Sequence, residues 1–177
     1  MGSVSDVVPP VTKLIRSTDV LLYLFNRLPP DVFFWKDETG ESLVHTLCLS
    51  RFSAFKALYQ EAGPQLLKEE SFTGKTVLHV AAEFGRIELL RFLLEEMDQE
   101  DVCKKCKGRG ALALHYAVRK KHHQAARMLA AAMPAGMRFE PDFSGYSAVQ
   151  LAEEIDATGY FENLSGALAI NVTKGAM

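Results

Sequence analysis

Cysteine and long apolar runs are both scarce in this sequence. Cys48, Cys103 and Cys106 are too few to form a disulfide framework in a chain of 177 residues, which favours a reducing compartment. No stretch of about 18 apolar residues occurs, so no membrane-spanning helix is predicted. The first residues also lack the basic-then-apolar pattern of a signal peptide. We therefore expect an intracellular protein, in the cytoplasm and also in the nucleus if its partner is nuclear.

A large excess of either charge is also missing. The 20 Lys and Arg residues face 22 Asp and Glu residues, and the net charge of −2 argues against general nucleic-acid binding. An apolar content of 48% and a charged content of 24% are ordinary for an ordered domain and exclude a disordered chain. The sequence contains no motif that places a nucleophile beside a base. It also contains no phosphate-binding loop and no motif that pairs two carboxylates. We expect neither enzymatic activity nor a cofactor.

What the sequence does contain is an internal repeat. Its glycines, Gly40, Gly74, Gly110 and Gly145, are 34, 36 and 35 residues apart. Each begins a similar hexapeptide: GESLVH, GKTVLH, GALALH and GYSAVQ. An apolar residue also lies eight positions before each glycine: Val32, Leu66, Val102 and Met137. A period in this range is typical of solenoids, in which stacked units bury the apolar faces that one unit cannot bury alone.

Each unit is expected to hold two helices, such as a short apolar one over residues 77–82 and an amphipathic one containing Ile87, Leu90 and Leu94. The segment from Gly74 to Leu94, GKTVLHVAAEFGRIELLRFLL, resembles the ankyrin repeat. This resemblance implies an all-α solenoid of about four helix-pair repeats with an N-terminal capping helix. It also implies hairpin-like fingers that form, with the first helices, a concave surface that generally binds proteins.

The repeat register predicts a set of boundaries along the chain. Residues 19–28 align with residues 88–97, so they are expected to form the second helix of an incomplete first repeat. The expected units are a disordered N-terminus at 1–11, the capping helix at 12–36, repeats at 37–70, 71–106, 107–141 and 142–170, the last as a C-terminal cap, and a tail at 171–177.

Several positions depart from the family pattern. Leu112 replaces the usual threonine, and Gln150 replaces the last histidine. The glycine between the two helices is present only as Gly85, while Arg51, Lys121 and Asp156 stand at the equivalent positions. We expect looser turns at those three positions, because they lack the conformational freedom of glycine.

Histidines and cysteines invite a metal interpretation, which we consider the weaker one. His45, His79 and His115 occupy the same position in successive units, so they would lie too far apart to share an ion at ~2.0–2.1 Å. The resemblance implies that they join neighbouring units by hydrogen bonds. Cys103 and Cys106 have zinc-ligand spacing, with His115, His122 and His123 downstream, but a second cysteine pair is missing. We expect no metal site.

Charge is unevenly distributed along the third unit. Between residues 102 and 139 there is no acid but nine bases, directly after five acids within residues 95–101. Lys107 and Arg109 are expected at a finger tip, and Arg119 and Lys120 at the exposed end of a first helix, all facing the concavity. These bases form either an ordinary solvated surface or a docking patch for an acidic protein segment.

Aromatic residues supply a second set of candidate contacts. Phe72 and Phe143 are expected at finger tips, Phe84 and Tyr116 on first helices, and Trp35 in the first finger. They either form interface hot spots or pack against neighbouring fingers. The full set of predicted partner-binding residues is Trp35, Phe72, Glu83, Phe84, Lys105, Lys107, Arg109, Tyr116, Arg119, Lys120 and Phe143.

The function expected from the resemblance is non-catalytic protein binding by a monomeric adaptor, scaffold or inhibitor. In size and layout the chain is similar to the small IκB-like ankyrin proteins, including viral vankyrins, which implies a Rel/NF-κB-type transcription factor as an alternative partner. Nucleic-acid binding through the basic third repeat is a second alternative, opposed by the net negative charge.

Overall fold

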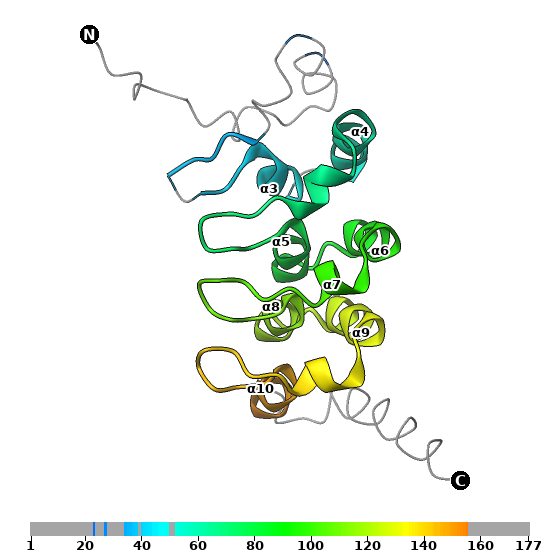
Figure 1. Cartoon of the computed structure of the whole chain (residues 1–177). Coiled ribbons are helices and arrows are strands. Elements are labelled where there is room, and N and C mark those ends of the chain that lie inside the picture. The colour runs from blue at the N-terminus through cyan, green and yellow to red at the C-terminus, as the bar shows by residue number, and fades with distance from the viewer. Residues whose placement is uncertain (1–22, 24–26, 28–33, 39, 50–51, 156–177) are drawn as a thin grey trace, which may run out of the picture.

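The computed structural model describes residues 23, 27, 34–38, 40–49 and 52–155, and within them the chain is helical with no named strand. The first helices of successive units stand in one column and the second helices in a parallel column (Figure 1). The first column holds α3 (Leu43–Leu47), α5 (Val77–Glu83), α8 (Ala113–Arg119) and α10 (Ala148–Ile155). The second holds α4 (Phe52–Ala62), α6 (Ile87–Glu96) and α9 (His123–Ala132). The expected all-α solenoid is confirmed.

Hairpin-like fingers project from the side of the first column that faces away from the second (Figure 1). Antiparallel bridges close the first, second and fourth fingers: Lys36–Ser42, Glu70–Thr76 and Pro141–Ser147. In the second finger the Ser71 amide donates to the Lys75 carbonyl at 2.9 Å, a closure that needs the positive φ of +71° at Gly74. The third finger is one residue longer, because there the Cys106 amide donates to the Ala111 carbonyl at 2.9 Å.

A third, short helical element precedes each of the later fingers. These elements are η2 (Pro64–Lys68), α7 (Gln99–Val102) and η3 (Ala135–Phe139). Leu66 and Val102, two of the apolar residues eight positions before the unit glycine, are buried in η2 and α7. The repeated apolar residue therefore anchors the link between one unit and the next finger.

The core runs continuously through the stack, because both helices of each unit contribute to it. The first helices α5 and α8 bury nearly every side chain, whereas the second helices α6 and α9 bury one face. Fully buried leucines link the units, among them Leu58, Leu78, Leu90, Leu93, Leu114 and Leu129. This rigid stack fixes where the fingers and the exposed faces of the first helices lie.

The turn between α8 and α9 is not looser than its glycine-containing counterpart, so that expectation is wrong at Lys121. Lys121 has a φ of +59°, against +61° at Gly85. The His122 amide donates to the Ala117 carbonyl at 2.9 Å, as the Arg86 amide does to the Ala81 carbonyl. The same hydrogen bonds hold both turns. The predicted loose turns at Arg51 and Asp156 lie outside the described residues.

Other predictions also fall outside the described part of the chain. These are the disordered N-terminus at 1–11, most of the capping helix at 12–36, the part of the fourth repeat beyond residue 155 and the tail at 171–177.

Candidate protein-binding surface

The histidines of the first two described units join neighbouring units. The Thr76 amide donates to Nδ1 of His79 at 3.2 Å, so Nε2 carries the proton, which it donates to the Ala111 carbonyl of the next unit at 3.1 Å. His45 bonds in the same way, to the Lys75 carbonyl at 2.9 Å. Burial lowers the pKa of His79 to about 4, which keeps it neutral. Both ring nitrogens of each histidine form hydrogen bonds, which agrees with the structural role that the resemblance implies.

The third histidine makes the local contact, but its contact to the next unit is weaker. Nδ1 of His115 accepts from the Leu112 amide at 3.1 Å, whereas Nε2 lies near the Tyr146 and Glu140 carbonyls without a hydrogen bond of normal geometry within the described residues. In the fourth unit, the Oε1 atom of Gln150 takes the place of Nδ1 and accepts from the Ser147 amide at 3.0 Å. Glutamine thus reproduces the local contact of the missing histidine.

Cys103 and Cys106, at the start of the third finger, are free cysteines. Cys106 is buried with its Sγ 3.3 Å from the Tyr116 hydroxyl, and Cys103 is half-buried. Burial raises the pKa of the Cys103 thiol, which disfavours the thiolate that a metal or an oxidant needs. In the described residues, no group of three or more His, Cys, Asp or Glu side chains is placed to hold a metal ion.

A single line of side chains crosses the second, third and fourth fingers. Phe72, Lys107 and Phe143 each lie over the glycine of the preceding finger, at a position where a Cβ atom would clash with them. The Phe143 amide donates to the Arg109 carbonyl at 2.8 Å and the Gly108 amide to the Thr73 carbonyl at 2.9 Å, so neighbouring fingers are tied together.

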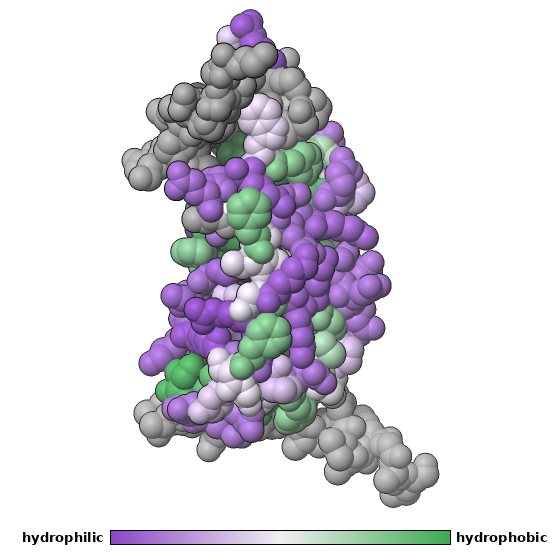
Figure 2. All heavy atoms as spheres, turned by 60° about the vertical axis from the view of Figure 1, so that its left-hand side comes forward, coloured by the Kyte–Doolittle hydropathy of each residue, from purple (hydrophilic) through white to green (hydrophobic). Residues whose placement is uncertain are grey.

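The finger aromatics are packed on neighbouring fingers but are not buried by them. Phe72 and Phe143 pack on the neighbouring finger and yet remain 67% and 76% exposed. Trp35, at the base of the first finger, is 55% exposed. The face carrying the finger tips shows separate apolar patches in a largely hydrophilic surface (Figure 2).

The basic third unit is largely neutralised by its neighbours. Lys104 and Lys107 lie 2.5 and 2.6 Å from the Glu70 carboxylate of the second finger. Lys105 lies 3.0 Å from Glu140. These acids come from adjacent units, a pairing that the long acid-free segment of the third unit did not suggest. These ion pairs reduce the net positive charge of the predicted basic patch.

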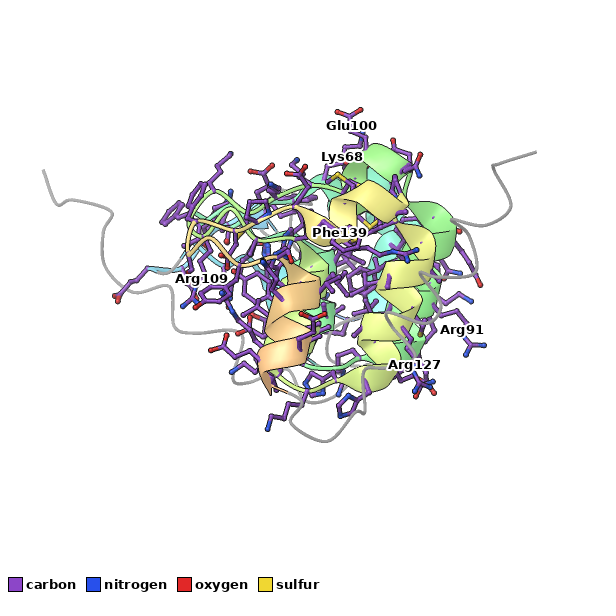
Figure 3. All side chains as sticks on the ribbon, turned by 90° about the horizontal axis from the view of Figure 1, so that it is seen from below. Lys68, Arg91, Glu100, Arg109, Arg127 and Phe139 are labelled. Carbon is purple, nitrogen blue, oxygen red and sulfur yellow. The ribbon has the colours of Figure 1, made fainter. Side chains whose placement is uncertain are left out.

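Arg119 also forms an ion pair and, contrary to expectation, does not lie at an exposed end of its helix. Its guanidinium lies 2.5 Å from Asp142, whose side chain is 1% exposed. Although burial opposes it, the Ser144 amide and Arg119 hold the pKa of Asp142 below its usual value. Lys120 and Arg109 are exposed and form no ion pair with the described residues. Figure 3 shows Arg109 on the finger side and Arg91 and Arg127 on the opposite side, along the second helices.

Tyr116 is buried, so the expectation that it is an exposed aromatic is wrong. It is 6% exposed, its ring meets His79 edge to face, and the Lys75 ammonium lies 4.9 Å from the ring centroid. Burial raises the pKa of its hydroxyl, which is paired with Cys106.

The remaining predicted contacts lie at the ends of α5 and α8. Glu83 bonds to Lys75 at 2.7 Å, and its carbonyl accepts from Nε2 of His122. Phe84 is 52% exposed and lines an open hollow of about 490 Å³ beside Phe52. Tyr146 in the fourth finger is 43% exposed and is absent from the predicted contacts, because the family pattern leaves that position variable.

The family model for ankyrin repeats (3 copies) matches residues 43–137, which is 95 of the 177 residues. The chain belongs to the ankyrin repeat family. No curated protein matches the sequence significantly. Ankyrin repeats generally mediate protein–protein interaction and are typically non-catalytic. In the described residues, no helix of this ankyrin protein is long and apolar enough to cross a bilayer.

Proposed function

We propose that this ankyrin protein is a non-catalytic module that binds a partner protein on the surface formed by its fingers and first helices. The observation that carries the proposal is the exposure of large apolar side chains there, above all Phe72 at 67% and Phe143 at 76%. Aromatic residues held on a rigid surface are typical interface hot spots. The module acts as an adaptor, scaffold or inhibitor according to what it binds.

The ion pairs of the third unit favour a protein partner over nucleic acid. Lys104, Lys105, Lys107 and Arg119 each face a carboxylate from a neighbouring unit, which reduces the positive charge that a phosphate backbone would meet. Binding that depends on apolar residues as well as charge is characteristic of protein interfaces.

Affinity purification of the full chain with mass spectrometry tests the proposal. One variant changes the fingers, Phe72→Ser/Phe143→Ser, and another changes the helix ends, Phe84→Ser/Lys120→Glu. The matched control, Arg91→Glu/Arg127→Glu, changes exposed second-helix residues on the opposite side. We expect a partner that is lost with the finger or helix-end variant and retained by the control. Partners lost only with the control would place binding on the second helices and overturn the proposal.

A further inference from the structure

We propose that the line formed by Phe72, Lys107 and Phe143, with Arg109 beside it, binds an extended segment of the partner protein. We call this line the finger column. The segment would carry two large apolar residues about six residues apart, with an acidic residue between them. This inference rests on the proposed function and adds the chemistry of what is bound.

The two phenylalanines of the finger column are held ready for binding. Phe72 rests on Gly40 and Phe143 on Gly110, with no room for a side chain at either glycine. The Phe143 amide is fixed by the Arg109 carbonyl at 2.8 Å. A side chain that is already oriented loses little conformational entropy on binding, so its exposed apolar area is available for affinity. The two rings therefore form fixed apolar anchor points.

Positive charge lies between these two apolar points. Lys104 and Lys107 share one carboxylate, Glu70, and Arg109 forms no ion pair with the described residues, so the tip of the third finger keeps an excess of positive charge. Lys107 remains 74% exposed even though it is paired, and Arg109 is exposed. An incoming carboxylate can reach both side chains.

The tips on either side of this charge are neutral. Phe72 is flanked by Ser71 and Thr73. Phe143 is flanked by Ser144 and by Asp142, whose charge is balanced by Arg119. Figure 2 shows the corresponding pattern on the finger side, with separate apolar patches and hydrophilic surface between them. The complementary ligand is apolar at both ends and acidic in the middle.

The distance between Phe72 and Phe143 sets the length of the ligand. Packed helices lie about 8–10 Å apart, so two units separate Phe72 from Phe143 by roughly 20 Å. An extended chain covers about 3.3 Å per residue, which places the apolar residues about six apart. Residues an even number apart share a face of an extended chain, so the acid belongs two or four residues after the first apolar residue.

A synthetic peptide tests this arrangement directly. The probe is a fluorescein-labelled serine-based peptide with two phenylalanines six residues apart and glutamates at the two even positions between them. Comparison peptides place the phenylalanines three residues apart or replace the glutamates by lysines. We expect the comparison peptides to bind the full chain at least about tenfold more weakly in fluorescence anisotropy, which corresponds to about 1.4 kcal/mol. Equal binding of all three peptides would overturn the inference.

Protein variants locate the bound peptide. Phe72→Ala and Phe143→Ala should each weaken binding about tenfold, and Lys107→Glu/Arg109→Glu should weaken it further. Phe139→Ala is the matched control, because Phe139 is 55% exposed in η3 and outside the column. Arg127→Glu is the charge control. If the controls weaken binding as much as the column variants, the peptide does not bind at the column.

The outcome separates this inference from the proposed function. A natural partner that is lost with Phe84→Ser/Lys120→Glu, while the peptide fails to bind, would leave the proposed function standing and overturn the inference. Peptide binding that follows the column variants supports both. A solenoid that binds neither the peptide nor any protein through its fingers or first helices would overturn both.

Discussion

At the residue scale, the turns at Gly85 and Lys121 require the same backbone conformation from two different residue types. Both residues adopt a left-handed conformation, with φ of +61° and +59°. The resemblance identified Gly85 as the turn residue, but propensity alone could not predict that Lys121 adopts the same φ. The bond from the His122 amide to the Ala117 carbonyl imposes the conformation, because the packing of α8 on α9 fixes both of its ends.

Replacement of Lys121 by glycine should stabilise the protein. The left-handed conformation costs a residue with a Cβ atom roughly 1–2 kcal/mol, and the greater flexibility of glycine in the unfolded chain offsets about half of that. We expect Lys121→Gly to raise the free energy of unfolding by about 0.5–1 kcal/mol in urea denaturation.

Lys120 and Gly85 provide the controls for this measurement. Lys120 has a φ of −90°, so Lys120→Gly should lower the free energy of unfolding. Gly85→Ala should also destabilise, because its Cβ would lie 2.7 Å from Nδ1 of His122. If Lys121→Gly destabilises as much as Lys120→Gly, the Lys121 side chain contributes contacts that outweigh its backbone strain.

At the scale of the element, the buried histidines couple each first helix to the next finger. The hexapeptides alone placed these histidines in equivalent positions, but not their hydrogen-bond partners. The carbonyl of Ala111 lies 32 residues along the chain from His79, and only stacking brings the two together. For the same reason the burial of Tyr116 could not be predicted, because its ring packs against His79 and Lys75 of the preceding unit.

The buried His79 should make stability depend on pH. Its folded pKa of about 4 lies below the ordinary 6.5, so the unfolded chain binds the proton more readily. The stabilisation is complete above pH 6.5 and is lost as the pH falls toward 4, by an amount on the order of 3 kcal/mol. We expect chemical denaturation of the His79→Gln variant to show a smaller loss over that range than the parent protein.

Gln150 makes this substitution a reasonable one, because it already performs the local role of the histidine in the fourth unit. The difference between the two pH curves isolates His79 from carboxylates that titrate in the same range. Parallel curves for parent and variant would mean that His79 is accessible to protons in the folded state.

At the scale of the whole molecule, the junctions between units are unequal. The first two described junctions have a histidine hydrogen bond of normal geometry to the next unit, whereas at the third Nε2 of His115 lies near the Tyr146 and Glu140 carbonyls without forming one in the described region. Stability in a solenoid is close to a sum of unit and junction contributions. The third junction should therefore open more readily than the second.

Hydrogen exchange with mass spectrometry can compare the two junctions. We expect amides of α10 to exchange at least several-fold faster than those of α5, because α10 packs across the weaker junction. His115→Gln should change this pattern little, whereas His79→Gln should speed exchange in α5 and α8. Uniform exchange rates across the helices would show that the array opens as one cooperative block.

The stacking of helix pairs into a solenoid could be predicted from the glycine spacing, but the distribution of charge between the units could not. A run of bases in one segment indicates a basic surface patch only if no acids from other segments lie beside it in the folded protein. Here Glu70 and Glu140 are in neighbouring fingers and face those bases across the junctions. The sequence lists the charges of each unit in turn, whereas the fold pairs each unit with both of its neighbours.

Three ion pairs at the bases of the fingers alternate in sign from one unit to the next, although Lys68 and Asp101 pair in the opposite sense at the second junction. Lys36 faces Glu69, Glu70 faces Lys104, and Lys105 faces Glu140. Loss of a single interior unit would place like charges opposite each other at these finger positions. Loss or duplication of two adjacent units would keep each of these bases opposite an acid.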